Sequence, residues 1–207
     1  MPSFRAISLF FVASLASLSL TSAAPQYTPT APSGCDAACM AKCHLPVIFA
    51  GLHAEIAPKV DIMSAMSEGK ADKIKPIVVE ITSSIDKAVV QVQACVDAKV
   101  GLDVALAADV DASAVLTIGA FVQVVVSLVA SIVVCIQAAL KVAVKTELNL
   151  IIGICATVCV RLAVLLQLSC QLVGGLAVSL LLQLPAYIAL CAQLGVGACV
   201  DFLKVAV

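Results

Sequence analysis

Apolar residues dominate the second half of the chain, where mildly polar residues recur at a spacing of four in two long runs. In the run from residue 113 to residue 145 these positions are Gln123, Ser127, Ser131 and Cys135, and Lys141 and Lys145 extend roughly the same side. In the run from residue 165 to residue 185 they are Gln167, Gln171, Gly175, Ser179 and Gln183. Neither run shows the alternation with period two that a half-buried strand requires, so both predict helices.

The two polar stripes have two interpretations that the pattern leaves open. In a packed bundle, glutamine and serine side chains face neighbouring helices and form hydrogen bonds with them. On a helix that lies at an interface, the same side chains form a thin wet face. Within the second stripe, Gly175 and Ser179 form a pair of small residues four apart, which favours the close approach of two helices.

The first half of the chain shows shorter helical patterns that contain charge. Cys35, Cys39 and Cys43 share one face of a predicted helix that Pro46 ends or kinks, and a second helical piece covers residues 47–56. A polar connection is expected over residues 66–76.

A longer amphipathic helix is expected to follow, with Pro76 in its first turn. Its apolar positions are Val79, Ile81, Ile85, Ala88, Val89, Val92, Cys95 and Val96. Residues 101–113 then form a short continuation or a loop. In the second half, Pro185 should break the chain before a last helix or a pair of short ones.

Charge divides the chain at about residue 111. There are 18 charged residues between Asp36 and Asp111, and six from residue 112 onward. Those six are Lys141, Lys145, Glu147, Arg161, Asp201 and Lys204. The protein is therefore amphiphilic along its length, with a charged amphipathic half at 35–111 and a very hydrophobic half at 112–207.

The amino terminus has the layout of a secretory signal peptide. Arg5 precedes a 15-residue apolar run, and small residues around Ala23 suit a cleavage site, so residues 1–23 are predicted to be removed. Residues 24–34 form a Pro-, Thr- and Ala-rich leader that is expected to be disordered. Residues 35–207 then make a single helical domain, and the protein is expected to be secreted, extracellular or in the cell wall.

Ten cysteines follow the predicted signal peptide, and an even number on the secretory route indicates disulfides. They are Cys35, Cys39, Cys43, Cys95, Cys135, Cys155, Cys159, Cys170, Cys191 and Cys199. One hypothesis is that the first three bridge to Cys155, Cys159 and their neighbours and so fix the charged half to the hydrophobic half. The spacing alone does not assign the pairs. The expected fold is an all-α, disulfide-stapled helical bundle of about five to seven helices.

No catalytic motif or phosphate-binding loop is present, so the protein is predicted not to be an enzyme and to need no cofactor. A zinc site on Cys39, Cys43 and His44 is disfavoured, because the motif lacks a second pair of ligands and the oxidising route disfavours thiols. His53 stands alone and is expected on a partly exposed helix face. The net charge of −1 argues against a nucleic-acid partner.

The hydrophobic content is the main functional signal. It reaches 62%, with a mean hydropathy of +1.14, against about 45–50% apolar residues in ordinary domains. Such a chain has more apolar surface than one small core can bury, so we expect self-association and adsorption at air–water, cell-wall or lipid interfaces.

In layout, the chain resembles the secreted surface proteins of basidiomycete aerial hyphae, which have a hydrophilic N-terminal half and a hydrophobic C-terminal half. It differs from hydrophobins, whose eight cysteines include two adjacent pairs, because no two cysteines are adjacent here. The resemblance implies a surface-active structural protein of the hyphal surface, with roles in aerial growth and attachment.

Two other functions remain open. In a multi-pass membrane protein, segments 113–140 and 162–184 would be spans, and Arg161 would lie near the end of one of them. In a secreted helical carrier, the excess apolar residues would line a cavity for a lipid.

Overall fold

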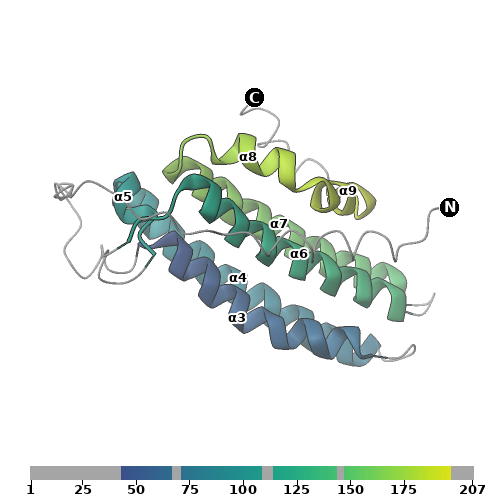
Figure 1. Ribbon diagram of the computed structural model, residues 1–207. Helices are drawn as coiled ribbons and strands as arrows, with labels where there is room; N and C mark the ends of the chain where they lie inside the picture. Colours follow the sequence, from purple (N-terminus) through teal and green to yellow (C-terminus); the bar gives the residue numbers. More distant parts are fainter. Residues whose placement is uncertain (1–42, 67–70, 109–113, 144–146, 197–207) are drawn as a thin grey trace. The chain divides into compact units, whose positions relative to one another are not determined.

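In a computed structural model of the protein, the described residues are 43–66, 71–108, 114–143 and 147–196, all within a compact unit that covers residues 31–207. Seven helices make up most of these ranges (Figure 1). They are α3 (Leu45–Ser64), α4 (Ala71–Asp97), α5 (Leu102–Ala105), α6 (Ile118–Val142), α7 (Leu148–Leu172), α8 (Leu176–Gln183) and α9 (Pro185–Gln193). The all-α prediction is confirmed for this part of the chain. The predicted signal peptide and leader, and Cys35, Cys39 and Cys199, lie outside the described residues.

Helix α4 buries a narrow apolar stripe. Its buried apolar residues alternate between spacings of four and three: Ile74, Val78, Ile81, Ile85, Ala88, Val92 and Cys95. This seven-residue repeat keeps one line of side chains on one side of a helix. That side contacts α7 and α3. Val79 was predicted to belong to the apolar face, but it falls between the buried positions and is 53% exposed.

Helices α6 and α7 bury much wider faces. Pairs of adjacent residues are buried along both helices, such as Val125 with Val126 in α6 and Leu165 with Leu166 in α7. The cause is that α6 contacts α3, α7, α8 and α9, while α7 contacts α4, α6 and α8. A helix that is covered on several sides is apolar nearly all round, which explains the low charge of this part of the sequence.

The described helices before residue 111 pack against those after it. The most extensive contacts join α4 to α7 and α3 to α6, so each long helix of the charged half lies along one of the hydrophobic half. Between α3 and α6, the buried rings of Phe49 and Phe121 meet edge to face with centroids 5.3 Å apart. The amphipathic helices therefore cover part of the apolar surface that the sequence leaves in surplus.

Two prolines lie at helix starts, whereas the position predicted for a third proline, Pro76, is wrong. Pro46 lies in the first turn of α3, and Pro185 is the first residue of α9. Proline suits these positions because a backbone N–H in the first turn has no acceptor within the helix. Helix α4, however, begins at Ala71, so Pro76 lies beyond its first turn and the polar connection is shorter than expected. Burial of Ile74 accounts for the extra turn, because it adds one more apolar contact to the stripe.

The spacing of the second polar run predicted a single helix, and this prediction is wrong. Helix α7 ends at Leu172, and Gly175 adopts φ +80°, a left-handed conformation that glycine tolerates without strain. Helix α8 starts directly after Gly175 and ends before Pro185, as predicted for the proline. The axes of α8 and α9 differ by 74°.

Candidate functional site

The long helices α6 and α7 contain much of the apolar sequence that was the main functional signal. Each has 25 residues and is long and apolar enough to cross a membrane. At about 1.5 Å per residue each exceeds the ~30 Å hydrocarbon core of a bilayer. Helices α8 and α9 satisfy the same criterion only if the bent pair is taken as one span. Half of the most apolar stretch of α6 and 39% of that of α7 are buried inside the protein, so apolar surface remains outside.

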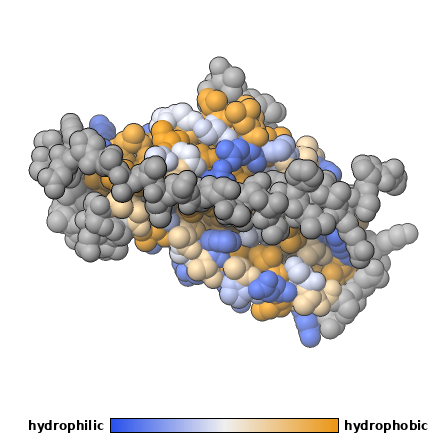
Figure 2. All heavy atoms as spheres, viewed as in Figure 1, coloured by the Kyte–Doolittle hydropathy of each residue, from blue (hydrophilic) through white to orange (hydrophobic). Residues whose placement is uncertain are grey.

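Large apolar side chains are exposed on both halves of the chain. They are Val47, Ile62, Val79, Val90, Leu102, Val115, Val134, Leu150, Val178 and Leu182. The most exposed is Leu182 of α8, at 77%. On the face drawn in Figure 2, hydrophobic and hydrophilic residues share the surface. The apolar surplus is therefore spread over several helices instead of forming one binding pocket.

The only charged residue among the described residues of α7 is Arg161, and it lies near the middle of the helix. Its Nε lies 3.3 Å from Asp86 Oδ1 of α4, and the two side chains are 49% and 45% exposed. The sequence interpretation placed Arg161 near the end of a span that starts at residue 162. That placement is wrong, because the helix starts fourteen residues earlier, at Leu148.

The first polar stripe makes hydrogen bonds between helices. Gln123 Nε2 donates to Gln183 Oε1 at 2.9 Å and joins α6 to α8. Ser131 Oγ lies 3.0 Å from His53 Nε2 of α3, and the same hydroxyl donates to the Ser127 carbonyl at 3.1 Å. Because the serine hydrogen is already directed to that carbonyl, His53 is the donor in its bond to Ser131.

The second polar stripe divides into different environments. Gln167 and Gln171 are exposed on α7, and the Ser179 hydroxyl donates to the Gly175 carbonyl at 3.3 Å. A Cβ on Gly175 would meet no atom within 4 Å, so this glycine does not serve the close approach of two helices, contrary to the prediction. Its left-handed backbone is what the position requires.

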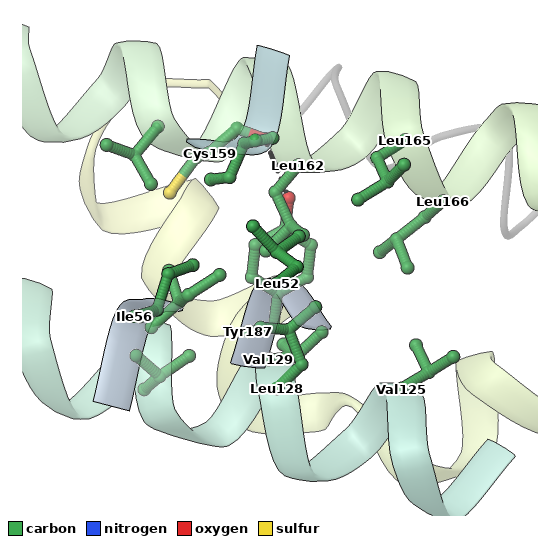
Figure 3. Packing of buried hydrophobic residues seen from close by; sticks show 14 of the residues in the cluster. Leu52, Ile56, Val125, Leu128, Val129, Cys159, Leu162, Leu165, Leu166 and Tyr187 are labelled. Atoms are coloured by element: carbon green, nitrogen blue, oxygen red, sulfur yellow. Dashed lines mark hydrogen bonds between the residues drawn. The ribbon is translucent and has the colours of Figure 1, made fainter. Parts of the chain in front are cut away.

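Tyr187 anchors α9 to α7, and the sequence analysis did not single it out. Its hydroxyl donates to the Cys159 carbonyl at 2.8 Å, and the side chain is 1% exposed among apolar residues of α3, α6 and α7 (Figure 3). A buried phenol needs such a partner, because an unpaired hydroxyl in an apolar core is costly. The available signal was that Tyr187 is the only tyrosine in the hydrophobic half.

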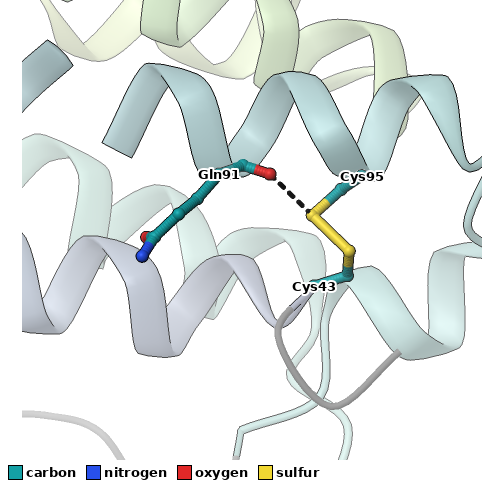
Figure 4. Close-up of a disulfide and its surroundings, with 3 residues drawn as sticks. All are labelled: Cys43, Gln91 and Cys95. Atoms are coloured by element: carbon teal, nitrogen blue, oxygen red, sulfur yellow. Dashed lines mark hydrogen bonds between the residues drawn. A yellow bond between two sulfur atoms is a disulfide. The ribbon is translucent and has the colours of Figure 1, made fainter. Parts of the chain in front are cut away.

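One disulfide is present in the described part of the chain, between Cys43 and Cys95 (Figure 4). Their Cα atoms are 5.4 Å apart, within the usual range for a bridge. It joins the start of α3 to the end of α4, so both of its cysteines belong to the charged half. The hypothesis that Cys43 bridges to Cys155 or Cys159 is therefore wrong, and the same bond removes Cys43 from any zinc site with His44.

The remaining described cysteines lie on the hydrophobic helices. Cys135 of α6, Cys155 and Cys159 of α7 and Cys191 of α9 are buried, and Cys170 is partly exposed. Burial raises the pKa of Cys135 and of Cys170 to about 11 and that of Cys155 to about 12. Such thiols stay protonated and unreactive at neutral pH. Among the described residues, no group of three or more histidine, cysteine or acidic side chains is placed to hold a metal ion.

Two shallow grooves lie on the surface of the described helices. One, of about 320 Å³, lies between α3 and α4 and includes His44, whose buried Nδ1 has no hydrogen-bond partner among the described residues. The other, of about 540 Å³, lies between α4 and α7 and is lined by Val79, Asp86 and Leu150, among others. Both are open to solvent, unlike the enclosed apolar cavity expected of a lipid carrier.

The fold defines the class of protein coarsely, as an all-α bundle in which amphipathic helices lie along two long apolar helices. No known protein family, characterised protein or solved structure matches the chain.

Proposed function

We propose that the protein is a secreted, non-enzymatic structural protein that acts by adsorbing at hydrophobic interfaces. The resemblance in layout to basidiomycete surface proteins suggests the hyphal surface or the cell wall as its place, with aerial growth and attachment as its roles. The observation that carries the proposal is the incomplete burial of α6 and α7. Their most apolar stretches are only half and 39% buried inside the folded protein.

Helices α3 and α4 form one layer, and α6 and α7 form a second layer that packs against it. The contacts between these two layers suggest how adsorption proceeds. Apart from apolar packing, α3 and α4 are held to α6 and α7 by polar links such as His53–Ser131 and Arg161–Asp86. The second of these is about half exposed, and ion pairs in water contribute little, about 0–1 kcal/mol. An apolar phase can replace the packing contacts between the layers, because the hydrophobic effect is not directional. Adsorption then separates the layers and turns the apolar sides of α6 and α7 toward the interface.

A multi-pass membrane protein is the second candidate, since α6 and α7 satisfy the length and composition of a span. The position of Arg161 argues against it. If α7 crossed a bilayer, this guanidinium would lie near the midplane, which costs about 2.5–3.5 kcal/mol or more. In the folded protein it lies at the surface beside a carboxylate of an amphipathic helix.

Pendant-drop tensiometry of the purified mature protein tests the proposal directly. We expect a fall in air–water and oil–water surface tension at micromolar concentration. Replacing Leu182 by Gln on α8 should weaken adsorption by about tenfold, since burial of one leucine contributes about 1.5–3 kcal/mol. Val90→Gln on α4 is the matched control, because Val90 is also exposed, at 69%, but belongs to the charged half.

Two results would contradict the proposal. One is a protein that leaves the surface tension of both interfaces unchanged. The other is retention in membranes after carbonate extraction, with none in the medium or cell wall, which would favour the multi-pass alternative.

A further inference from the structure

The groove between α3 and α4 is lined by a polar side chain whose hydrogen bonding is incomplete. His44 is 3% exposed, and its Nδ1 has no hydrogen-bond partner among the described residues. A buried polar atom without a partner costs free energy, so such an atom in a native fold calls for an explanation, such as a bound molecule. Ser84 is a second buried polar residue on the same groove.

The disulfide between Cys43 and Cys95 sets the register of the two helices along the groove (Figure 4). His44 directly follows Cys43, so it lies at the disulfide end of the groove. Gly51 of α3 and Lys87 of α4 are each eight residues from their own cysteine, and the helices are antiparallel, so the two residues lie opposite each other.

Gly51 leaves space in the middle of the groove. It lies inside α3, its φ is not positive, and a Cβ at this position would meet no atom within 4 Å. Neither a turn nor a close helix contact therefore requires glycine here, and glycine inside a helix is less favourable than alanine. A side chain at this position would instead fill the groove of about 320 Å³. That volume is at the lower end of the range of small-molecule sites, about 300–1,000 Å³.

The His44 end of the groove suits an anion. His44 is the N-cap residue of α3, its side chain makes no capping hydrogen bond, and the first turn of the helix holds no acidic residue. The N-terminus of a helix carries partial positive charge and favours negative groups. Lys87 and Gln91 line the same groove, and Lys87 forms no ion pair within the described part of the chain.

The acidic residue that lines the groove, Glu55, belongs to its other end. It follows His44 by eleven residues, about 16 Å along the helix axis. The register is maintained at this end, where Lys59 Nζ of α3 lies 3.7 Å from Glu80 Oε2 of α4. An anion beside His44 is therefore well separated from the Glu55 carboxylate.

We propose that this groove binds a small amphiphile with one carboxylate and a short apolar chain, such as a medium-chain fatty acid. The carboxylate lies beside His44, within reach of the Lys87 side chain, and accepts charge-assisted hydrogen bonds there. The chain lies over Gly51, against Val47 and Leu52. Because the groove is open, one side of the ligand stays in water, unlike a long lipid in the enclosed cavity of a carrier. The proposal does not depend on adsorption at interfaces.

A ¹H–¹⁵N NMR titration of the full mature protein with hexanoate tests the binding. We expect saturable shifts of the amide signals of residues 44–52, with a Kd of about 1–20 mM for a ligand of about eight heavy atoms. Hexanol and acetate should bind at least tenfold more weakly, because the first lacks the charge and the second lacks the chain. Equal binding of either one, or no saturable shift with hexanoate, would overturn the proposal.

Two glycine variants locate the site. Gly51→Leu places a side chain in the groove and should weaken hexanoate binding at least tenfold without lowering Tm, because leucine is a better helix former than glycine. Gly153→Leu is the matched control. Gly153 also lies inside a long helix with open space at its Cβ position, but it lines the groove between α4 and α7. Loss of binding in the control variant, or unchanged binding in Gly51→Leu, would overturn the proposal.

Two polar variants test the recognition of the carboxylate. Lys87→Gln changes an exposed residue, and His44→Phe keeps a buried ring while it removes the unpaired nitrogen, so neither should lower Tm. Each should weaken hexanoate binding by about three- to tenfold. Lys75→Gln, on an exposed part of α4 outside the groove, is the control. Unchanged hexanoate affinity in either His44→Phe or Lys87→Gln would overturn the proposal.

Co-sedimentation with vesicles distinguishes a free ligand from a lipid headgroup that carries the same carboxylate. The protein and Gly51→Leu should sediment equally with phosphatidylserine vesicles, and phosphatidylcholine vesicles are the reference. Weaker sedimentation of Gly51→Leu with phosphatidylserine alone would assign the groove to a membrane surface and overturn the proposal. Hexanoate binding by a protein without interfacial activity would overturn the proposed function alone, and interfacial activity without hexanoate binding would overturn this inference alone.

Discussion

The Arg161 side chain of α7 lies beside the Asp86 carboxylate of α4, with Nε 3.3 Å from Oδ1. The pair shows which side of the most apolar part of the chain faces water, because both residues remain about half exposed. Both residues lie near the middle of their helices, along the contact between α4 and α7. The exposure of this pair is one reason why we propose a surface-active protein in preference to a membrane-spanning one.

The Arg161–Asp86 pair is expected to contribute little to stability. Arg161→Gln and Asp86→Asn should each lower the free energy of unfolding by less than about 1 kcal/mol, because water and salt screen an exposed pair. A double-mutant cycle from urea unfolding, at 50 mM and at 500 mM salt, measures the coupling. The coupling should be positive and should shrink at high salt. A coupling above 3 kcal/mol would show instead that the pair is buried, as a membrane environment requires.

The buried thiols predict how the stability of the reduced protein depends on pH. Burial raises the pKa of Cys135 to about 11 and of Cys155 to about 12 from 9.0, so these thiols favour the folded state fully below pH 9. Above pH 9 they ionise first in unfolded chains, and this stability is lost as pH rises toward 11–12. Each thiol adds at most about 1.4 kcal/mol per pH unit to the slope.

Urea unfolding between pH 8 and pH 10.5, in the presence of reductant, measures this slope. The matched control protein carries Cys135→Ala and Cys155→Ala, and its free energy of unfolding should fall less steeply above pH 9. Lysines and tyrosines titrate in the same way in both proteins, so the difference in slope comes from the two thiols. Equal slopes would contradict the raised pKa values.

The helical periodicity of the sequence predicts the all-α fold, and proline predicts the break before α9. The same periodicity misleads at the second polar stripe, because Gly175 continues the spacing of four from Gln171 to Ser179 across a turn. The glycine pair at 174–175 was the better signal for a helix end.

Contacts between helices could not be predicted in the same way. Tyr187 with Cys159 and His53 with Ser131 are far apart in sequence, so no local pattern shows that they meet. The cysteine pairing is the same case, since Cys43 and Cys95 are brought together only by the antiparallel packing of α3 and α4.

Removing the hydroxyl of Tyr187 should weaken the docking of α9. Tyr187→Phe keeps the buried ring but removes the donor to the Cys159 carbonyl, and we expect a loss of about 1 kcal/mol in the free energy of unfolding. Thr157→Val is the control, because it removes an exposed hydroxyl that donates to a carbonyl of its own helix. Faster hydrogen exchange confined to α9 would locate the effect, and unchanged stability and exchange would contradict it.

Two adjacent glycines separate the effect of backbone conformation from that of packing. Gly174 and Gly175 both have open space where a Cβ would lie, but only Gly175 has a positive φ, +80°. Gly175→Ala should therefore lower the free energy of unfolding by about 1–2 kcal/mol, because alanine is strained in the left-handed region. Gly174→Ala should be neutral or stabilising by up to about 1 kcal/mol, since it restricts the unfolded chain. Urea unfolding of both variants measures the difference. Equal effects would mean that the turn between α7 and α8 does not depend on the left-handed conformation of Gly175. In that case α7 and α8 could join into the single helix that the polar spacing predicts.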